Sequence, residues 1–121
     1  MLEILTKAKL VVTADLIINL KRNVIKIGRA EDADQNPLLF RLVDNGHHVE
    51  IKNNVFTRCI SRVHGEFTWN KQLKRYEYTD LSKYGSWING KRVHYGKKQV
   101  LNNQDKLAVG SEKLEIEIIY S

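Results

Sequence analysis

The feature of this sequence that most constrains its fold is a series of short runs rich in branched and aromatic apolar residues, separated by polar or turn-forming residues. The clearest run is residues 63–69, where apolar or small side chains at odd positions alternate with polar ones at even positions. A period of two is typical of a half-buried β-strand, because successive side chains point to opposite faces of a sheet. On this pattern His64 lies on the face opposite Phe67 and Trp69.

Similar runs predict strands along the whole chain. The predicted strands are residues 2–5, 8–12, 16–20, 24–28, 49–51, 63–69, 76–80, 92–95, 99–101, 106–109 and 114–120. Residues 70–75 are expected to form a hairpin turn, and Asn89 followed by Gly90 is the preferred pair for a type I′ turn. Helical periodicity is nearly absent and proline occurs once. About ten short strands of this kind predict an all-β fold, specifically a β-sandwich.

Residues 30–54 carry the weakest pattern. Asn36 and Pro37 are followed by the apolar run Leu-Leu-Phe-Arg-Leu-Val and then by Asp-Asn-Gly, which fits either a capped short helix or a strand. Residues 52–60 are then expected to form a loop that leads to Ser61.

The chain length of 121 residues suits one domain spanning 1–121, either excised from a longer protein or its amino-terminal part. The formal net charge of +6 favours acidic partners, such as phosphopeptides, nucleic acid or anionic lipid headgroups. A single cysteine, Cys59, excludes an internal disulfide, and the amino terminus lacks the features of a signal peptide. These two features favour a reducing, intracellular compartment. No apolar run approaches the roughly 20 residues that a membrane-spanning helix requires.

Candidate functional residues follow or interrupt the predicted strands in three places. Arg29 comes directly after Gly28 at the end of a strand, Ser61 and Arg62 precede another strand, and residues 80–90 form a polar, glycine-containing stretch. Guanidinium groups, a hydroxyl and loop backbone amides are the donors that a phosphate dianion requires. We therefore expect the three segments to converge on one phosphate, with His64 as a structural residue that ties the loops together.

Two kinds of chemistry are disfavoured by the same residues. Ser61, His64 and Asp80 could be parts of a nucleophilic site, but no Gly-x-Ser-x-Gly turn, positioned base or oxyanion hole is evident. The four histidines and one cysteine do not have the paired spacing of metal ligands. The sequence thus predicts no catalytic residue, metal or cofactor.

The order and spacing of three motifs resemble those of forkhead-associated (FHA) domains. The motifs are Ile-Gly-Arg, Ser-Arg-x-His and Asp-Leu-Ser-x-x-Gly-Ser-x-x-Asn-Gly, and the resemblance runs from about Ile25 to Val109. The hallmark positions of the family correspond to Gly28, Arg29, Ser61, His64 and Asn89.

This resemblance implies a sandwich of about eleven strands whose loops bind phosphothreonine peptides at one end. It implies that Arg29 and Ser61 contact the phosphate with help from Arg62, while residues 82–84 hold the peptide backbone and flank the threonine methyl group. The implied peptide-binding residues are Arg29, Ser61, Arg62, Ser82, Lys83, Tyr84 and Asn89, and the implied loop-structuring residues are Gly28, His64, Gly85 and Gly90. A nuclear role in kinase signalling, DNA-damage response, or cell-cycle or meiotic control would follow.

The sequence departs from the family pattern in a few places. The separation of Arg29 from Ser61 suggests an insertion at residues 30–48. Lys83 and Tyr84 stand where the family more often has small or amide side chains, and Lys83 adds a cation. Cys59 falls within the surface that would read residues beyond the phosphothreonine.

Two other functions fit parts of the sequence. A basic nucleic-acid-binding domain would account for the charge, although the arginines are dispersed and form no basic run. A non-catalytic regulatory fragment of a protein kinase is the other alternative, since no kinase motif is present.

Overall fold

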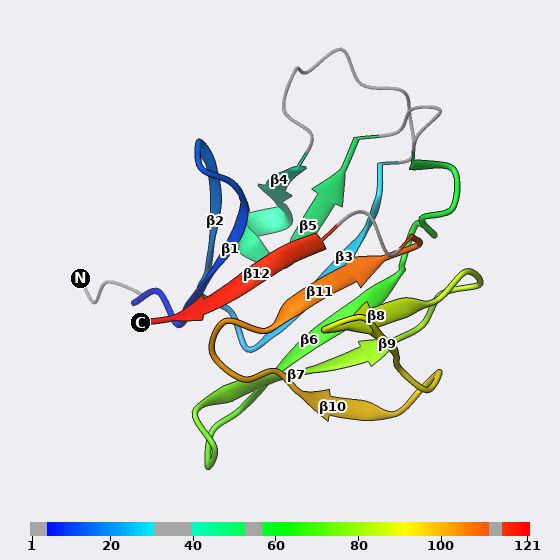
Figure 1. Cartoon of the computed structure of the whole chain (residues 1–121). Coiled ribbons are helices and arrows are strands. Elements are labelled where there is room, and N and C mark those ends of the chain that lie inside the picture. The colour runs from blue at the N-terminus through cyan, green and yellow to red at the C-terminus, as the bar shows by residue number, and fades with distance from the viewer. Residues whose placement is uncertain (1–4, 31–39, 53–56, 112–114) are drawn as a thin grey trace.

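The computed structural model describes residues 5–30, 40–52, 57–111 and 115–121, and these residues form twelve short strands and one short 3₁₀ turn (Figure 1). In chain order they are β1 Ala8–Thr13, β2 Leu16–Leu20, β3 Val24–Arg29, β4 Phe40–Val43, η1 Asp44–Gly46, β5 His48–Ile51, β6 Gly65–Asn70, β7 Arg75–Asp80, β8 Ser86–Ile88, β9 Lys91–Arg92, β10 Lys98–Val100, β11 Lys106–Val109 and β12 Glu115–Tyr120. The predicted all-β class is confirmed. Among these elements, no helix is long and apolar enough to cross a membrane.

The strands form two sheets of six. One has the order β2-β1-β12-β11-β8-β9 and the other β10-β7-β6-β3-β5-β4. Neighbouring strands are antiparallel except β3 and β5, which run parallel. In Figure 1 the loops before β6 and before β8 both lie on the right-hand side of the sandwich. Loops that are far apart in sequence are therefore brought to one end of the molecule.

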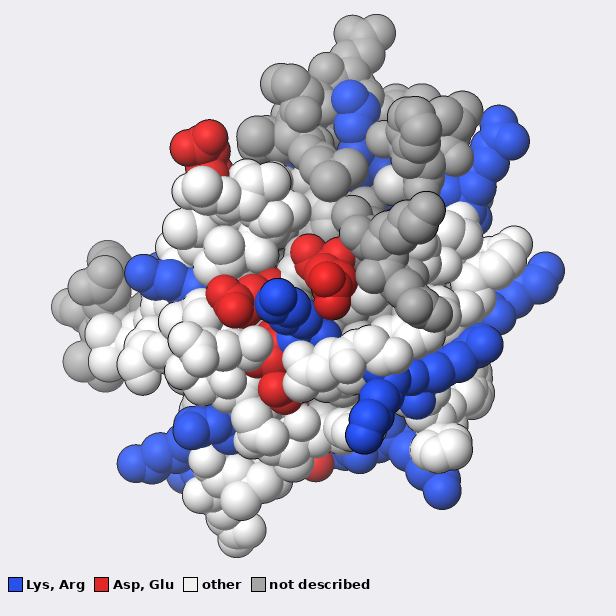
Figure 2. Space-filling model, in the orientation of Figure 1, with Lys and Arg blue, Asp and Glu red and all other residues white. Residues whose placement is uncertain are grey.

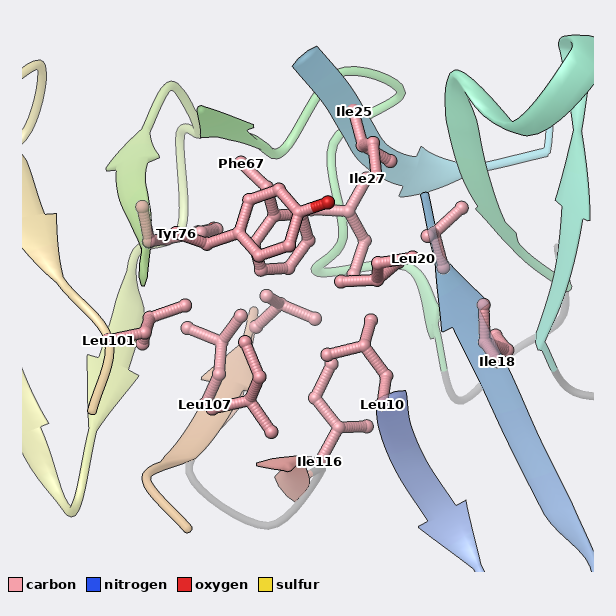
Figure 3. Close-up of a cluster of buried hydrophobic side chains, with 14 of the residues drawn as sticks. Leu10, Ile18, Leu20, Ile25, Ile27, Phe67, Tyr76, Leu101, Leu107 and Ile116 are labelled. Atoms are coloured by element: carbon pink, nitrogen blue, oxygen red, sulfur yellow. The ribbon is translucent and has the colours of Figure 1, made fainter. Parts of the chain in front are cut away.

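The core lies between the sheets and is built from the alternate residues that the strand pattern predicts (Figure 3). In β7, for example, Tyr76, Tyr78 and Asp80 are buried while the residues between them are partly exposed. Phe67 packs edge-on against Tyr76, with ring centroids 6.1 Å apart. The hydroxyl of Tyr76 donates to the carbonyl of Arg22 at 2.7 Å, so this polar atom is satisfied at the edge of the core.

The structure describes only part of residues 30–54, where the sequence pattern was weakest. Residues 40–43 form strand β4, so the strand alternative is correct there, and the helical content is limited to the three residues of η1. Because β4 and β5 extend the sheet beyond β3, residues 40–48 belong to the sandwich itself. The rest of the expected insertion, residues 31–39, and most of the predicted strand 2–5 lie outside the described residues.

Strand boundaries differ most near residues 80–95. The stretch that the sequence treats as a loop contains strand β8, which pairs with β9 across a two-residue turn. Strand β9 covers only Lys91 and Arg92, and Tyr95 instead forms an isolated bridge with Asp80. The pairing of β8 between β9 and β11 fixes the direction in which the preceding loop leaves the sandwich.

Candidate functional site

Three segments meet at the loop end of the sandwich, and Ser61 joins them. The backbone N–H of Arg29, at the end of β3, donates to the carbonyl of Ser61 at 3.0 Å. The backbone N–H of Lys83 donates to the hydroxyl oxygen of Ser61 at 3.3 Å. The N–H of His64 donates to the carbonyl of Ile27 at 2.8 Å. The structure therefore brings the three predicted segments together.

Gly28 allows β3 to approach the Ser61 loop closely. A Cβ atom at this position would lie 1.8 Å from the backbone oxygen of Arg62, which is far inside van der Waals contact. The close backbone approach expected for this glycine is present, and any larger residue would force β3 and the loop apart.

His64 is fully buried and links the loops through both ring nitrogens. Nδ1 accepts a hydrogen bond from the backbone N–H of Ser61 at 3.0 Å, and Nε2 donates to the carbonyl of Gly85 at 2.7 Å. This pattern requires the neutral ring, since Nδ1 is an acceptor. Burial lowers the pKa of His64, and the Gly85 hydrogen bond and the Asp80 charge oppose that change.

The predicted orientation of His64 was wrong. Strand β6 begins at Gly65, one residue later, so residues 61–64 do not follow the period of two. Val63 is 41% exposed and His64 is 0% exposed, the reverse of the alternating pattern. The two hydrogen bonds of the imidazole ring explain why a polar side chain faces inward here.

Asp80 organises the loop before β8. Its Oδ1 atom accepts from the backbone N–H of Ser82 at 3.2 Å, from the Ser82 hydroxyl at 2.6 Å and from the Ser86 hydroxyl at 2.9 Å. The Ser82 hydroxyl oxygen also accepts from the N–H of Gly85 at 2.8 Å. Ser82 is buried and its hydroxyl both donates and accepts within the loop, so this residue helps to shape the loop, and its contact with a peptide stays a prediction.

Arg29 differs from these residues because its guanidinium group is incompletely paired. The side chain is partly exposed, yet its Nε atom is buried and has no hydrogen-bond partner in the described part of the chain. An unpaired buried donor is costly, and buried polar atoms in native proteins nearly always have a partner. Among the described residues, Arg29 thus keeps a donor that no acceptor satisfies.

Exposed cations surround this position. Arg62 and Lys83 are exposed, and the Lys83 ammonium lies 5.7 Å from the ring centroid of Tyr84, which is itself 45% exposed. Figure 2 shows Lys and Arg side chains along the right-hand side of the molecule, the side on which Figure 1 places the loops before β6 and β8. The electrostatic potential at this end thus favours an anion.

Asn89 and Gly90 form the predicted turn, between β8 and β9. Their φ angles are 52° and 80°, as a type I′ turn between β8 and β9 requires. The Asn89 side-chain amide donates to Asp105 Oδ1 at 2.9 Å, and its oxygen accepts from the backbone N–H of Lys106 at 2.9 Å. Asn89 follows β8, whereas Gly85 precedes it, so the two lie at opposite ends of this short strand.

The geometry does not assemble a nucleophile or a metal centre. His64 bonds the backbone N–H of Ser61, and no hydrogen bond joins its ring to the Ser61 hydroxyl. Within residues 5–30, 40–52, 57–111 and 115–121, no three His, Cys, Asp or Glu side chains are grouped to hold a metal ion.

Two further residues, Gly110 and Arg92, contact the loop before β8 and were not identified from the sequence. Gly110, at φ 73°, donates its N–H to the carbonyl of Gly85 at 2.9 Å, and a Cβ there would lie 2.4 Å from the carbonyl oxygen of Cys59. Arg92 contacts the loop before β8, as described below. Gly110 could have been found because it directly follows the predicted strand 106–109. Arg92 could have been found because a two-residue turn at Asn89 and Gly90 places it opposite Trp87.

Comparison with known proteins gives consistent results. The family model described as FHA domain matches residues 25–110. Among curated proteins, Germ layers disorganized gldi-3 of Caenorhabditis elegans is 29% identical over 93 residues, 74% of this chain and 9% of that protein. The probable serine/threonine-protein kinase fhkB of Dictyostelium discoideum is 29% identical over 112 residues, 85% of this chain and 9% of that protein. The chain thus spans less than a tenth of the length of either relative.

Solved structures share the fold. The amino-terminal FHA domain of S. cerevisiae Rad53p in complex with a phosphothreonine peptide aligns with a TM-score of 0.66 at 19% identity, over 95% of this chain and 94% of that one. The MEK1 FHA domain in complex with a HOP1 phosphothreonine peptide aligns with a TM-score of 0.66 at 18% identity, over 97% of this chain and 99% of that one. At these identities the similarity establishes the sandwich architecture.

Proposed function

This chain belongs to the FHA domain family, and from that premise we propose that it is a phosphothreonine-dependent protein interaction module. The two solved relatives above hold phosphothreonine peptides. In the proposed complex, the peptide crosses the loop end of the sandwich with its phosphate beside Arg29 and Ser61. Arg62 and Lys83 add positive charge, and Tyr84 flanks the threonine methyl group.

The observation that carries the proposal is the buried, unpaired Nε of Arg29. Guanidinium groups bind phosphate through charge-assisted hydrogen bonds, which are roughly twice as strong as neutral ones. The Ser61 hydroxyl accepts from the Lys83 N–H, so its own hydrogen is free to donate to a phosphate oxygen. A dianionic phosphate ester would thus accept hydrogen bonds from both the Arg29 guanidinium and the Ser61 hydroxyl.

We propose further that the chain is not an enzyme. FHA domains are known as non-catalytic binding modules, and the Ser61 hydroxyl here lacks the imidazole hydrogen bond that would activate it as a nucleophile. The neutral, buried His64 supports a structural role. A role in intracellular, nuclear kinase signalling, as expected from the sequence, is part of the same proposal, and the kinase among the relatives supports the signalling part.

A phosphopeptide library tests this function. The immobilised domain is incubated with a degenerate phosphothreonine peptide library and with the same library lacking phosphate, and the most enriched peptide is titrated by calorimetry. We expect retention of phosphorylated peptides only. Equal retention of both libraries would contradict the proposal. Parallel titrations with duplex DNA over a salt series test the nucleic-acid alternative, which requires tight DNA binding with a steep salt slope.

A further inference from the structure

We propose that Arg92 is a specificity-determining residue that binds an anionic side chain of the peptide, either Asp or Glu or a second phosphorylated residue, a few positions from the phosphothreonine. The proposal rests on the phosphothreonine-binding function and assigns a second contact to the same partner. It is carried by the way the β8–β9 hairpin holds the Arg92 guanidinium across the loop that contacts Ser61.

The hairpin places Arg92 opposite Trp87 on one face of the sheet. The guanidinium carbon lies 5.6 Å from the centroid of the Trp87 ring, a cation–π distance. One terminal nitrogen donates to the carbonyl of Tyr84 at 3.4 Å. These two contacts orient the guanidinium toward the loop before β8, although the residue is exposed at the surface.

Gly85 makes this orientation accessible. A Cβ atom on Gly85 would lie 2.8 Å from Nε and 2.8 Å from the terminal nitrogen of Arg92, so the guanidinium occupies the space that a side chain would fill. The φ angle of Gly85 is 101°, which other residues rarely adopt. The guanidinium position and the positive φ angle each favour glycine at residue 85. Only the guanidinium position involves Arg92.

Arg92 keeps most of its hydrogen-bonding capacity. In the described part of the chain it has one hydrogen bond, to Tyr84, and forms no ion pair with a carboxylate. Lys83, two residues before Gly85, likewise has no ion pair among these residues. An oriented guanidinium without a counter-ion is suited to bidentate binding of a carboxylate or a phosphate.

The position fits a peptide that is bound at Ser61. The loop joins both places, because the Lys83 N–H bonds the Ser61 hydroxyl oxygen while Tyr84 and Gly85 contact Arg92. A peptide whose phosphate lies beside Ser61 therefore passes the same loop that Arg92 contacts. One position of the peptide should therefore favour an anionic side chain.

The test compares two variants that each remove one positive charge from β9. A position-by-position phosphothreonine library first identifies where acidic residues are enriched, and the peptide with Asp, phosphoserine or Ala at that position is then titrated. We expect wild type to prefer an anionic residue over Ala by about three- to tenfold. Arg92→Ala should abolish this ratio, whereas Lys91→Ala, which removes the neighbouring exposed cation, should retain it. Whichever of the Asp and phosphoserine peptides gains more affinity over the Ala peptide shows whether Arg92 binds a carboxylate or a second phosphate.

Arg92→Gln keeps part of the stem over Trp87 and provides the same comparison if the Ala variant disturbs the loop. A folded Arg92→Ala or Arg92→Gln variant with an unchanged ratio would overturn the assignment, as would an equal loss in Lys91→Ala. If wild type binds no phosphothreonine peptide, the proposed function fails together with this inference. If it binds but without anionic preference, only the inference fails.

Discussion

At the scale of single residues, the site contains two kinds of side chain. Ser82, His64 and Asp80 make their hydrogen bonds within the protein, whereas Arg29 has a buried donor without a partner among the residues that the structure describes. The first kind should affect stability and binding together when substituted. The second should affect binding alone.

Arg29→Ala should weaken binding of the library-selected phosphopeptide about ten- to a hundredfold, because a charge-assisted hydrogen bond contributes about 1.5 to 3 kcal/mol. The melting temperature should not fall, since the substitution removes an unpaired buried donor. Lys71→Ala, which removes an exposed cation from the β6–β7 hairpin, is the control for net charge and should bind like wild type. Calorimetric titration and thermal melting of both variants provide the measurements, and undiminished affinity of folded Arg29→Ala would exclude this site.

His64→Ala should lower stability and binding together. The substitution leaves the N–H of Ser61 without its partner, at about 1 to 3 kcal/mol for a buried unsatisfied group, and removes one of the two donors to the carbonyl of Gly85, which keeps the N–H of Gly110. Urea unfolding gives the change in free energy, and titration below the unfolding midpoint gives the change in affinity. Normal unfolding combined with a selective loss of binding would instead make His64 a direct contact of the peptide.

At the scale of strands and loops, the close approach of β3 to the Ser61 loop sets the geometry of the site. Gly28→Ala should cost at least the 1 to 3 kcal/mol typical of overpacking, because its new Cβ would meet the backbone oxygen of Arg62. Gly90→Ala is the matched control: open space surrounds that position, so only its positive φ adds a cost, about 1 to 2 kcal/mol. Peptide affinity should fall in Gly28→Ala and stay unchanged in Gly90→Ala, and unaltered affinity in the first variant would refute the role of this contact.

The loops before β6 and β8 should also distinguish phosphothreonine from phosphoserine. If the methyl group is buried between Ser61 and the Lys83–Tyr84 segment, it contributes about 0.8 kcal/mol, or nearly fourfold in affinity. The measurement is a titration of two peptides that differ only in this methyl group. Equal affinities would remove the methyl pocket, and a much larger ratio would show that the pocket also fixes the peptide conformation.

The strands could be predicted from the sequence because burial on one face imposes a period of two, as in Tyr76 and Tyr78. The pattern failed at His64, where hydrogen bonds to two loops outweigh the face preference of a strand that starts one residue later. Strand β4 was ambiguous, since four residues beside a turn are too few for a helical or strand period to emerge.

The convergence of the Arg29, Ser61 and Lys83 segments could be predicted from motif order. Which side chains make hydrogen bonds within the loops could not be predicted in this way. The sequence placed Ser82 among the peptide-binding residues, and only the structure reveals that its hydroxyl donates to Asp80 and accepts from the N–H of Gly85. Such bonds depend on how β7 and β8 are placed, which motif spacing does not specify.

At the scale of the whole molecule, pH should act on the protein and on the ligand separately. Burial lowers the pKa of His64 below its ordinary value of 6.5, so the unfolded chain takes up the proton first as pH falls. The stability contributed by the neutral ring is therefore fully present above about pH 6.5 and decreases as pH drops toward the folded-state pKa. Binding measurements at low pH thus require urea unfolding at the same pH, to establish that the domain is folded.

Binding itself should weaken between about pH 7 and pH 5, because the second pKa of the phosphate ester is about 6. Arg29 and Lys83 favour the dianion, so the bound phosphate has a lowered pKa; affinity is full above the free pKa and falls as pH approaches the bound one. A site selective for the dianion loses up to about tenfold in affinity over this range. The same peptide with sulfothreonine carries a monoanion throughout, so its weaker binding should hardly change and reports any effect of the protein alone. Equal phosphopeptide affinities at both pH values, with the domain folded, would show that the site does not select the dianion.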